Sequence, residues 1–232
     1  MAQGYPMQQH NPVAGISVDA RATFITRTYL HLLGAIIAFV LIEVFLFSTG
    51  LAQPIAMAML SVSWLVVLGG FMIVGWFGTR MASAGGSLGK QYAGLGIYVL
   101  GQAIIFVPLL YIAQAYAPGT IESAALVTLM GFAGLTGVAI TTRKDFSFLG
   151  AILRWGFIAA LLLIVGGVIF GFQLGTFFSV AMIGLAGAAI LYDTSNVLHH
   201  FPEDQYVAAS LQLFASVALM FWYVLSLFMS RR

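Results

Sequence analysis

Apolar runs close to the thickness of a bilayer recur along this chain, and they limit what it can fold into. A transmembrane helix needs about 20 apolar residues in succession. Only 7% of the 232 residues are charged and the mean hydropathy is +1.02, whereas about 25% of the residues of a soluble domain are charged. Too few charged side chains remain to cover a water-facing surface. The pattern therefore predicts an all-α, polytopic membrane protein in the lipid bilayer.

Seven of these runs are predicted to be transmembrane helices. They cover residues 28–48, 54–78, 91–116, 122–141, 148–171, 174–197 and 207–229. Pro54 suits the first turn of the second run, where its missing N–H has no cost. Pro108 lies inside the third run, and we expect it to kink that helix.

The first 20 residues are polar, contain Pro and Gly, and do not have the basic segment and short apolar run of a cleavable signal. We predict a flexible cytoplasmic tail over residues 1–22 and a seven-helix membrane domain over residues 23–232. Ser17 or Asp19 can cap a short helix that leads into the first run.

The Lys and Arg residues are unevenly distributed, which predicts the orientation. Six of the nine flank the runs on one side: Arg21, Arg27, Arg80, Lys90, Arg143 and Lys144. The loops on the other side contain none: residues 49–53, 117–121 and 172–173. The N-terminus is therefore predicted to be cytoplasmic and the C-terminus outside. Arg231, Arg232 and the acidic pair Glu203–Asp204 depart from this rule.

Asp193 is the candidate functional residue, because an ionisable group inside a membrane helix is costly to keep there. At about 1.5 Å of rise per residue, Asp193, Arg154 and His31 lie at a similar depth near the cytoplasmic face. We predict a polar cluster in which Asp193 faces Arg154 or His31. Its mouth and margin would be formed by further polar residues: Arg143, Lys144, Asp145, Ser195 and Asn196.

Two interpretations of this cluster are open. A carboxylate paired with an arginine stays ionised, so protonation or separation of the pair could act as a gate. Histidine, which titrates near physiological pH, would add pH sensitivity through His31. The alternative is a structural ion pair with Arg154 extending toward the interface, because such pairs also occur inside membranes.

Glu43 is predicted to lie near the outer face, where it could line a vestibule, extend into solvent or stay protonated. His199 and His200 are adjacent but lack further ligands at suitable spacing, so no metal site is assigned. The chain has no cysteine and none of the HExxH, GxSxG or phosphate-binding loop motifs. We expect no enzyme activity and no cofactor, apart from weak, transient calcium binding. The net charge of +2 gives no reason to expect a nucleic-acid partner.

Two stretches resemble a known family. They are TTRKDFSFLG, residues 141–150, and GAAILYDTSN, residues 187–196. Both are similar to motifs of the Bax-inhibitor (TMBIM) family, and the likeness is greatest to its bacterial YccA-type branch. The resemblance implies a fold in which the last of seven helices is surrounded by the other six, and it implies an inner-membrane location.

The resemblance also implies two activities. One is a pH-sensitive calcium leak governed by an aspartate pair, of which Asp193 matches the first member and Phe214 occupies the position of the second. The other is binding and restraint of the membrane AAA+ protease FtsH. We therefore expect a pH-sensitive calcium or cation leak gated around Asp193. The alternative is an FtsH modulator without transport activity.

Overall fold

The structure, a computed structural model, describes residues 12–84 and 87–230. Within these ranges the chain forms a 3₁₀ helix and eight α-helices and has no β-strand. The elements are η1 (Val13–Gly15), α1 (Val18–Ser48), α2 (Ala52–Leu60), α3 (Trp64–Ala82), α4 (Leu88–Tyr116), α5 (Thr120–Thr142), α6 (Leu149–Phe170), α7 (Gly175–His199) and α8 (Tyr206–Met229). All α-helices except α2 are long and apolar enough to cross a membrane. The predicted all-α, seven-span architecture is confirmed.

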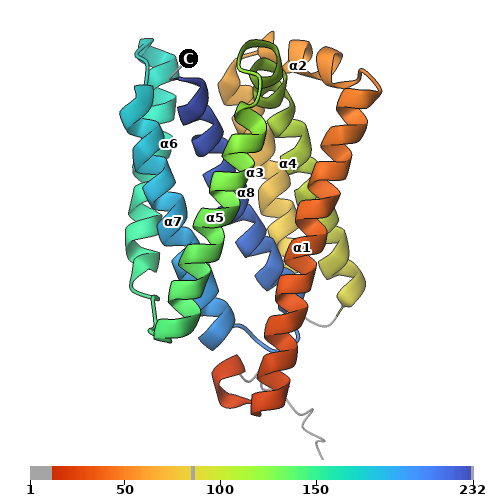
Figure 1. The fold of residues 1–232 in the computed structure, drawn as a ribbon, viewed down its shortest axis with the longest axis vertical. Helices are drawn as coiled ribbons and strands as arrows, with labels where there is room; N and C mark the ends of the chain where they lie inside the picture. Colours follow the sequence, from red (N-terminus) through yellow and green to blue (C-terminus); the bar gives the residue numbers. More distant parts are fainter. Residues whose placement is uncertain (1–11, 85–86, 231–232) are drawn as a thin grey trace, which may run out of the picture.

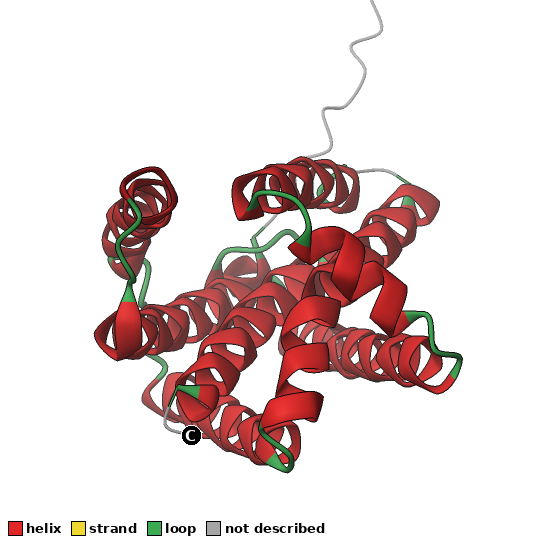
Figure 2. Ribbon diagram, turned by 90° about the horizontal axis from the view of Figure 1, so that it is seen from above, coloured by secondary structure: helices red, strands yellow, loops and turns green. Residues whose placement is uncertain are grey.

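α8 lies at the centre of the bundle. It packs against α1, α3, α4, α5 and α7, and most of its side chains are buried. α6 is the exception to the expected arrangement, because it packs on α7 and weakly on α3 and makes no contact with α8. Figure 1 shows α6 at the edge of the bundle beside α7, and Figure 2 shows the bundle from above. Five helices, rather than six, therefore contact α8 directly.

The second predicted span consists of two helices. α2 ends at Leu60, and α3 begins at Trp64 with Ser63 as its N-cap; the Ser63 side chain accepts a hydrogen bond from the N–H of Leu65. Pro54 is therefore in the short helix α2 and not at the start of a membrane span. The predicted run 54–78 was wrong as a single helix because the composition stays apolar across the break.

The N-terminal part of the chain is attached to the bundle. Val13 is fully buried, and its N–H donates to the carbonyl oxygen of Phe201 at 2.9 Å. Ser17 caps α1, and its side chain accepts a hydrogen bond from the N–H of Ala20 at 3.3 Å. Of the two predicted caps, Ser17 and Asp19, the first is confirmed. α1 then continues without a break to Ser48, so the predicted boundary at residue 22 falls inside a helix. Residues 1–11, the rest of the predicted tail, lie outside the described residues.

The alternation of the helices gathers the six flanking cations at one end of the bundle. α1, α4, α6 and α8 start at this end, and α3, α5 and α7 finish there (Figure 1). We call it the basic end, defined by Arg21, Arg27, Arg80, Lys90, Arg143 and Lys144, and we call the opposite end the far end. Its position on the cytoplasmic side stays a prediction.

Candidate functional site

Asp193 is buried in α7, with 8% of its surface exposed. Its Oδ2 accepts a hydrogen bond of 2.5 Å from the hydroxyl of Ser216 on the central helix α8. The next two residues, Thr194 and Ser195, are fully buried. The polar stretch in the sixth span therefore faces the interior of the bundle, as the cost of polar groups in lipid requires.

A cavity of about 910 Å³ lies beside Asp193. Side chains of α3, α4, α6, α7 and α8 line it, and we call it the α6 cavity because α6 forms its wall on the membrane side. Its polar lining toward the basic end includes Thr79, Arg154, Asp193, Gln212 and Ser216. The lining toward the far end is aliphatic and aromatic and includes Trp64, Leu68, Ile164, Val168, Phe172, Phe178, Leu219 and Trp222.

Arg154 and Asp193 both line this cavity, but they form no ion pair among the described residues. Arg154 is exposed on α6, at the edge of the bundle. The predicted direct pair of Asp193 with Arg154 was therefore wrong. The reason is geometric: depth along the membrane fixes the height of a side chain but not the direction in which it leaves its helix.

His31 lies in a different contact set. Its Nδ1 is 2.7 Å from the carbonyl oxygen of Arg27, and its Nε2 is 2.8 Å from the hydroxyl of Tyr92. Since a carbonyl oxygen can only accept, Nδ1 donates, and in the neutral ring Nε2 accepts from Tyr92. The ring also packs near Tyr206, with centroids 5.0 Å apart. The predicted pairing of His31 with Asp193 was wrong.

Phe214, at the position of the expected second aspartate, is 2% exposed. Its ring contacts Phe39 and Tyr98 edge-on, with centroid distances of 6.1 and 6.3 Å. The described residues also contain no group of three His, Asp or Glu side chains able to hold a metal ion. Asp193 thus has a hydroxyl, and not a second carboxylate, as its partner.

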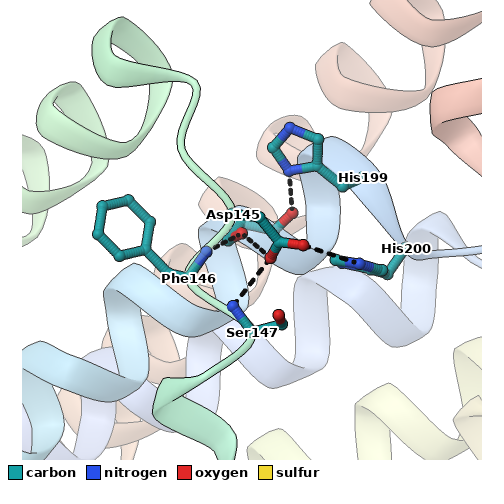
Figure 3. A network of polar contacts seen from close by, with 6 residues as sticks. Asp145, Phe146, Ser147, His199 and His200 are labelled. Carbon is teal, nitrogen blue, oxygen red and sulfur yellow. Dashed lines mark hydrogen bonds and ion pairs between the residues drawn. The ribbon is translucent and has the colours of Figure 1, made fainter.

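Asp145 connects the loop between α5 and α6 to the end of α7 (Figure 3). Its Oδ1 accepts from the N–H of Ser147 at 2.8 Å and from the Ser195 hydroxyl at 3.4 Å. The Ser195 hydroxyl oxygen accepts from the N–H of Phe146 at 2.9 Å, and Nε2 of His200 lies 3.4 Å from Oδ2 of Asp145. We call Asp145, Ser195 and His200 the loop staple.

The contacts of Asp145 fix its position and lower the pKa of its carboxyl group. The N–H of Ser147 lowers the pKa of this carboxyl, and the neighbouring His200 adds to the shift. Asp145 was expected at the mouth of a cluster around Asp193, but its contacts are with the C-terminal turn of α7. The carbonyl oxygen of Asn196 accepts from the N–H groups of His200 and Phe201, which ends α7.

Glu43 is buried in α1, with 7% of its surface exposed. Neither of its carboxyl oxygens has a hydrogen-bond partner within the described part of the chain. It does not line the α6 cavity, and its burial rules out extension into solvent. Of the three predicted situations, the solvated side chain is therefore wrong, and the vestibule and the protonated carboxyl stay predictions.

The sequence analysis missed several polar residues of the site. Ser216 is the partner of Asp193, and the amides of Gln102 and Gln212 line the same cavity. The Oε1 atom of each glutamine is buried without a partner among the described residues. Gln102 and Gln212 stand alone in apolar helical sequence, a signal that could have identified both.

Comparison with known proteins assigns this chain to a family. The family model described as "Inhibitor of apoptosis-promoting Bax1" matches residues 21–232. An uncharacterized protein of Pseudomonas aeruginosa is 30% identical over 168 residues, which cover 70% of this chain and 72% of that protein.

Two relatives have names that describe a role. The Escherichia coli (strain K12) protein named "Modulator of FtsH protease YccA" is 31% identical over 132 residues, 56% of this chain and 57% of that protein. A "Golgi anti-apoptotic protein" of vaccinia virus is 30% identical over 122 residues, 48% of each chain. The family match covers nearly the whole bundle. This chain is a multi-pass membrane protein that belongs to the Bax inhibitor family.

Proposed function

We propose that this chain modulates a membrane AAA+ protease of the FtsH type in a bacterial inner membrane. It would act as a binding partner, without enzyme activity or a cofactor of its own. The observation that carries the proposal is the similarity to YccA, which is named as a modulator of FtsH in one Escherichia coli strain and as an inner membrane protein in another.

The basic end is where we place the contact with the protease. Three chain segments meet there: η1, the loop from Arg143 to Phe148 and the loop from His200 to Gln205. Val13 and the loop staple hold the first two of these segments on the bundle. A partner that binds this end would therefore meet a surface of fixed shape, which lowers the entropy cost of association.

Degradation of a membrane substrate by a purified FtsH-type protease tests the proposal in proteoliposomes. We expect the wild-type chain to slow degradation. A variant that lacks residues 1–11 keeps Val13 and the Ser17 cap, so it tests the N-terminal segment with these two contacts in place; we expect a smaller effect from it. Asp193→Asn should act like wild type, because the Asp193 side chain is buried and forms no part of the surface at the basic end. An unchanged degradation rate with the wild-type chain would overturn the proposal.

The second candidate is a pH-sensitive leak for calcium or other cations. It is favoured by one observation, the buried carboxyl of Asp193 on the wall of the α6 cavity, since intramembrane carboxylates often mark ion pathways. Two features oppose it. Calcium prefers six to eight oxygen ligands, and Asp193 is the only carboxylate among the described residues that line the cavity. The positively charged Arg154 also lines the cavity and would repel a cation.

Calcium flux into proteoliposomes at acidic and alkaline pH tests the leak. A leak gated at Asp193 requires pH-dependent flux in the wild type that is lost in Asp193→Asn. Glu122→Gln, a carboxyl removed at the start of α5, is the matched control and should keep the flux. Equal flux in the wild type and Asp193→Asn, or no flux in either, would remove this candidate.

A further inference from the structure

The α6 cavity opens toward the surrounding membrane. Several of its lining residues on and just after α6 are exposed, with 39% of Phe157, 44% of Val168 and 46% of Phe172 accessible. α6 makes only slight contact with α3 and none with α8. The seam between α3 and α6 is thus among the weakest in the bundle, and the cavity behind it is accessible from the side.

The lining changes from polar to apolar along the membrane normal. Arg154 lies five residues into α6, about 8 Å from its start at the basic end. Val168 lies a further 14 residues along, about 21 Å away. At this far level, Trp64 stacks on Trp222, with ring centroids 5.7 Å apart. One hydrocarbon leaflet is about 15 Å thick, so the apolar part is long enough to hold an extended acyl chain.

We propose that this cavity binds one anionic phospholipid, with the headgroup at Arg154 and an acyl chain along the apolar wall toward Trp64 and Trp222. The volume of about 910 Å³ falls within the range of roughly 300–1,000 Å³ that is typical of small-molecule sites. The inference concerns a ligand of the bundle and is independent of the proposed action on a protease.

Charge complementarity selects an anionic headgroup. Two cations of the basic end stack on aromatic rings, Arg27 on Tyr206 and Arg80 on Trp76, and none of the six lines the α6 cavity. The guanidinium of Arg154 has no hydrogen bond, ion pair or ring contact among the described residues. An unpaired guanidinium near the membrane interface matches a phosphate, which it can bind through two parallel N–H donors.

The remaining polar groups fit the same occupant. Asp193 is turned to Ser216 and is buried, whereas Arg154 is exposed, so a headgroup that enters past α6 meets the arginine first. The amide of Gln212 lines the polar part, and its Oε1 is buried without a partner in the described chain. Because amide oxygen and nitrogen positions are interchangeable assignments, this group can donate to the ester oxygens of a lipid.

Tryptophan quenching by brominated lipids tests the proposal on the full-length chain. The chain has four tryptophans, of which Trp76 and Trp155 are exposed away from the cavity. In a Trp76→Phe, Trp155→Phe background, only Trp64 and Trp222 report. Vesicles of phosphatidylcholine and phosphatidylglycerol are prepared with the bromines on the acyl chains of either one lipid or the other.

We expect the anionic brominated lipid to be preferred about fivefold at matched mole fraction, as one cation near the membrane surface allows. Arg154→Gln should abolish this preference, Arg154→Lys should retain most of it, and Arg80→Gln, the matched cation outside the cavity, should leave it unchanged. Ala215→Phe, which fills the cavity, should lower quenching by both lipids. Equal quenching by both lipids in the parent protein, or a preference that survives Arg154→Gln, would overturn the proposal.

Discussion

Ser216 of α8 donates a hydrogen bond of 2.5 Å to Asp193 of α7. This contact joins the aspartate of the sixth span to the helix at the centre of the bundle. The carboxyl group is held by a hydroxyl from a neighbouring helix. The family pattern pairs this aspartate with a second carboxylate, whose position Phe214 occupies here, and sequence depth led us to expect a cation.

Removing the hydroxyl of Ser216 should destabilise the bundle. In Ser216→Ala the Asp193 carboxyl loses its partner while remaining buried, so we expect a loss of about 1–2 kcal/mol, the upper range for hydrogen bonds between membrane helices. Thermal unfolding in detergent measures it. Ser210→Ala is the matched control, because the Ser210 hydroxyl donates to the carbonyl oxygen of Val207 in its own helix. An equal loss in both variants would contradict the role of the interhelical bond.

Replacing Glu43 with an apolar residue should stabilise the protein. Its two carboxyl oxygens are buried without partners, and an unsatisfied buried polar group costs about 1–3 kcal/mol. We therefore expect Glu43→Leu to raise the unfolding temperature. Glu122→Leu, at the first turn of α5, should give no such gain. A lower unfolding temperature in Glu43→Leu would show that this carboxyl has a stabilising partner in the membrane.

The loop staple should weaken in acid. The pKa of Asp145 is lowered by the Ser147 N–H, so ionised Asp145 stabilises the loop above its unfolded pKa of about 3.9. That contribution is lost as the pH falls through the still lower folded pKa. We expect hydrogen exchange at Phe146 and Ser147, corrected for the intrinsic rate, to accelerate below about pH 4.

The same exchange in Asp145→Asn provides the control. The asparagine keeps an acceptor for Ser147 but cannot titrate, so its protection should not change over this pH range. Protection that falls with pH to the same extent in both proteins would assign the acid effect to another group.

The basic end should face the cytoplasm. The chain has no cysteine, so single cysteines report topology without interference. Ser83 lies in an exposed position at the end of α3, and Ser61 lies in an exposed position between α2 and α3. In cells whose outer membrane is permeabilised, a thiol reagent that cannot cross the inner membrane should label Ser61→Cys and not Ser83→Cys. The reverse pattern would contradict the orientation.

Most of the fold could be predicted from the sequence because burial in lipid imposes one strong rule, long apolar helices. The rule is insensitive to breaks, which is why α2 and α3 were predicted as one helix across Ser61–Ser63. Ser63 is a good N-cap residue, and this local signal marks the true start of α3. The position of α6 at the edge of the bundle could not be predicted, since its sequence is as apolar as that of a central helix.

The site was harder to predict because residue spacing gives the depth of a side chain in the membrane but not the direction in which it leaves its helix. Asp193 was identified from its chemistry and is buried beside a cavity. Its partner could not be identified, because nothing in the sequence distinguishes Ser216 from the other serines of the membrane helices. His31 instead contacts Tyr92 on α4. Arg154 is exposed at the edge of the bundle.

Energy transfer between this chain and a purified FtsH-type protease in one bilayer tests the central claim most directly. A donor on Ser83→Cys marks the basic end, a donor on Ser61→Cys marks the other side, and the acceptor is on the ATPase domain of the protease. We predict saturable transfer that is stronger from Ser83→Cys than from Ser61→Cys. Transfer no greater than that from an unrelated membrane protein at the same density would contradict the proposed partnership.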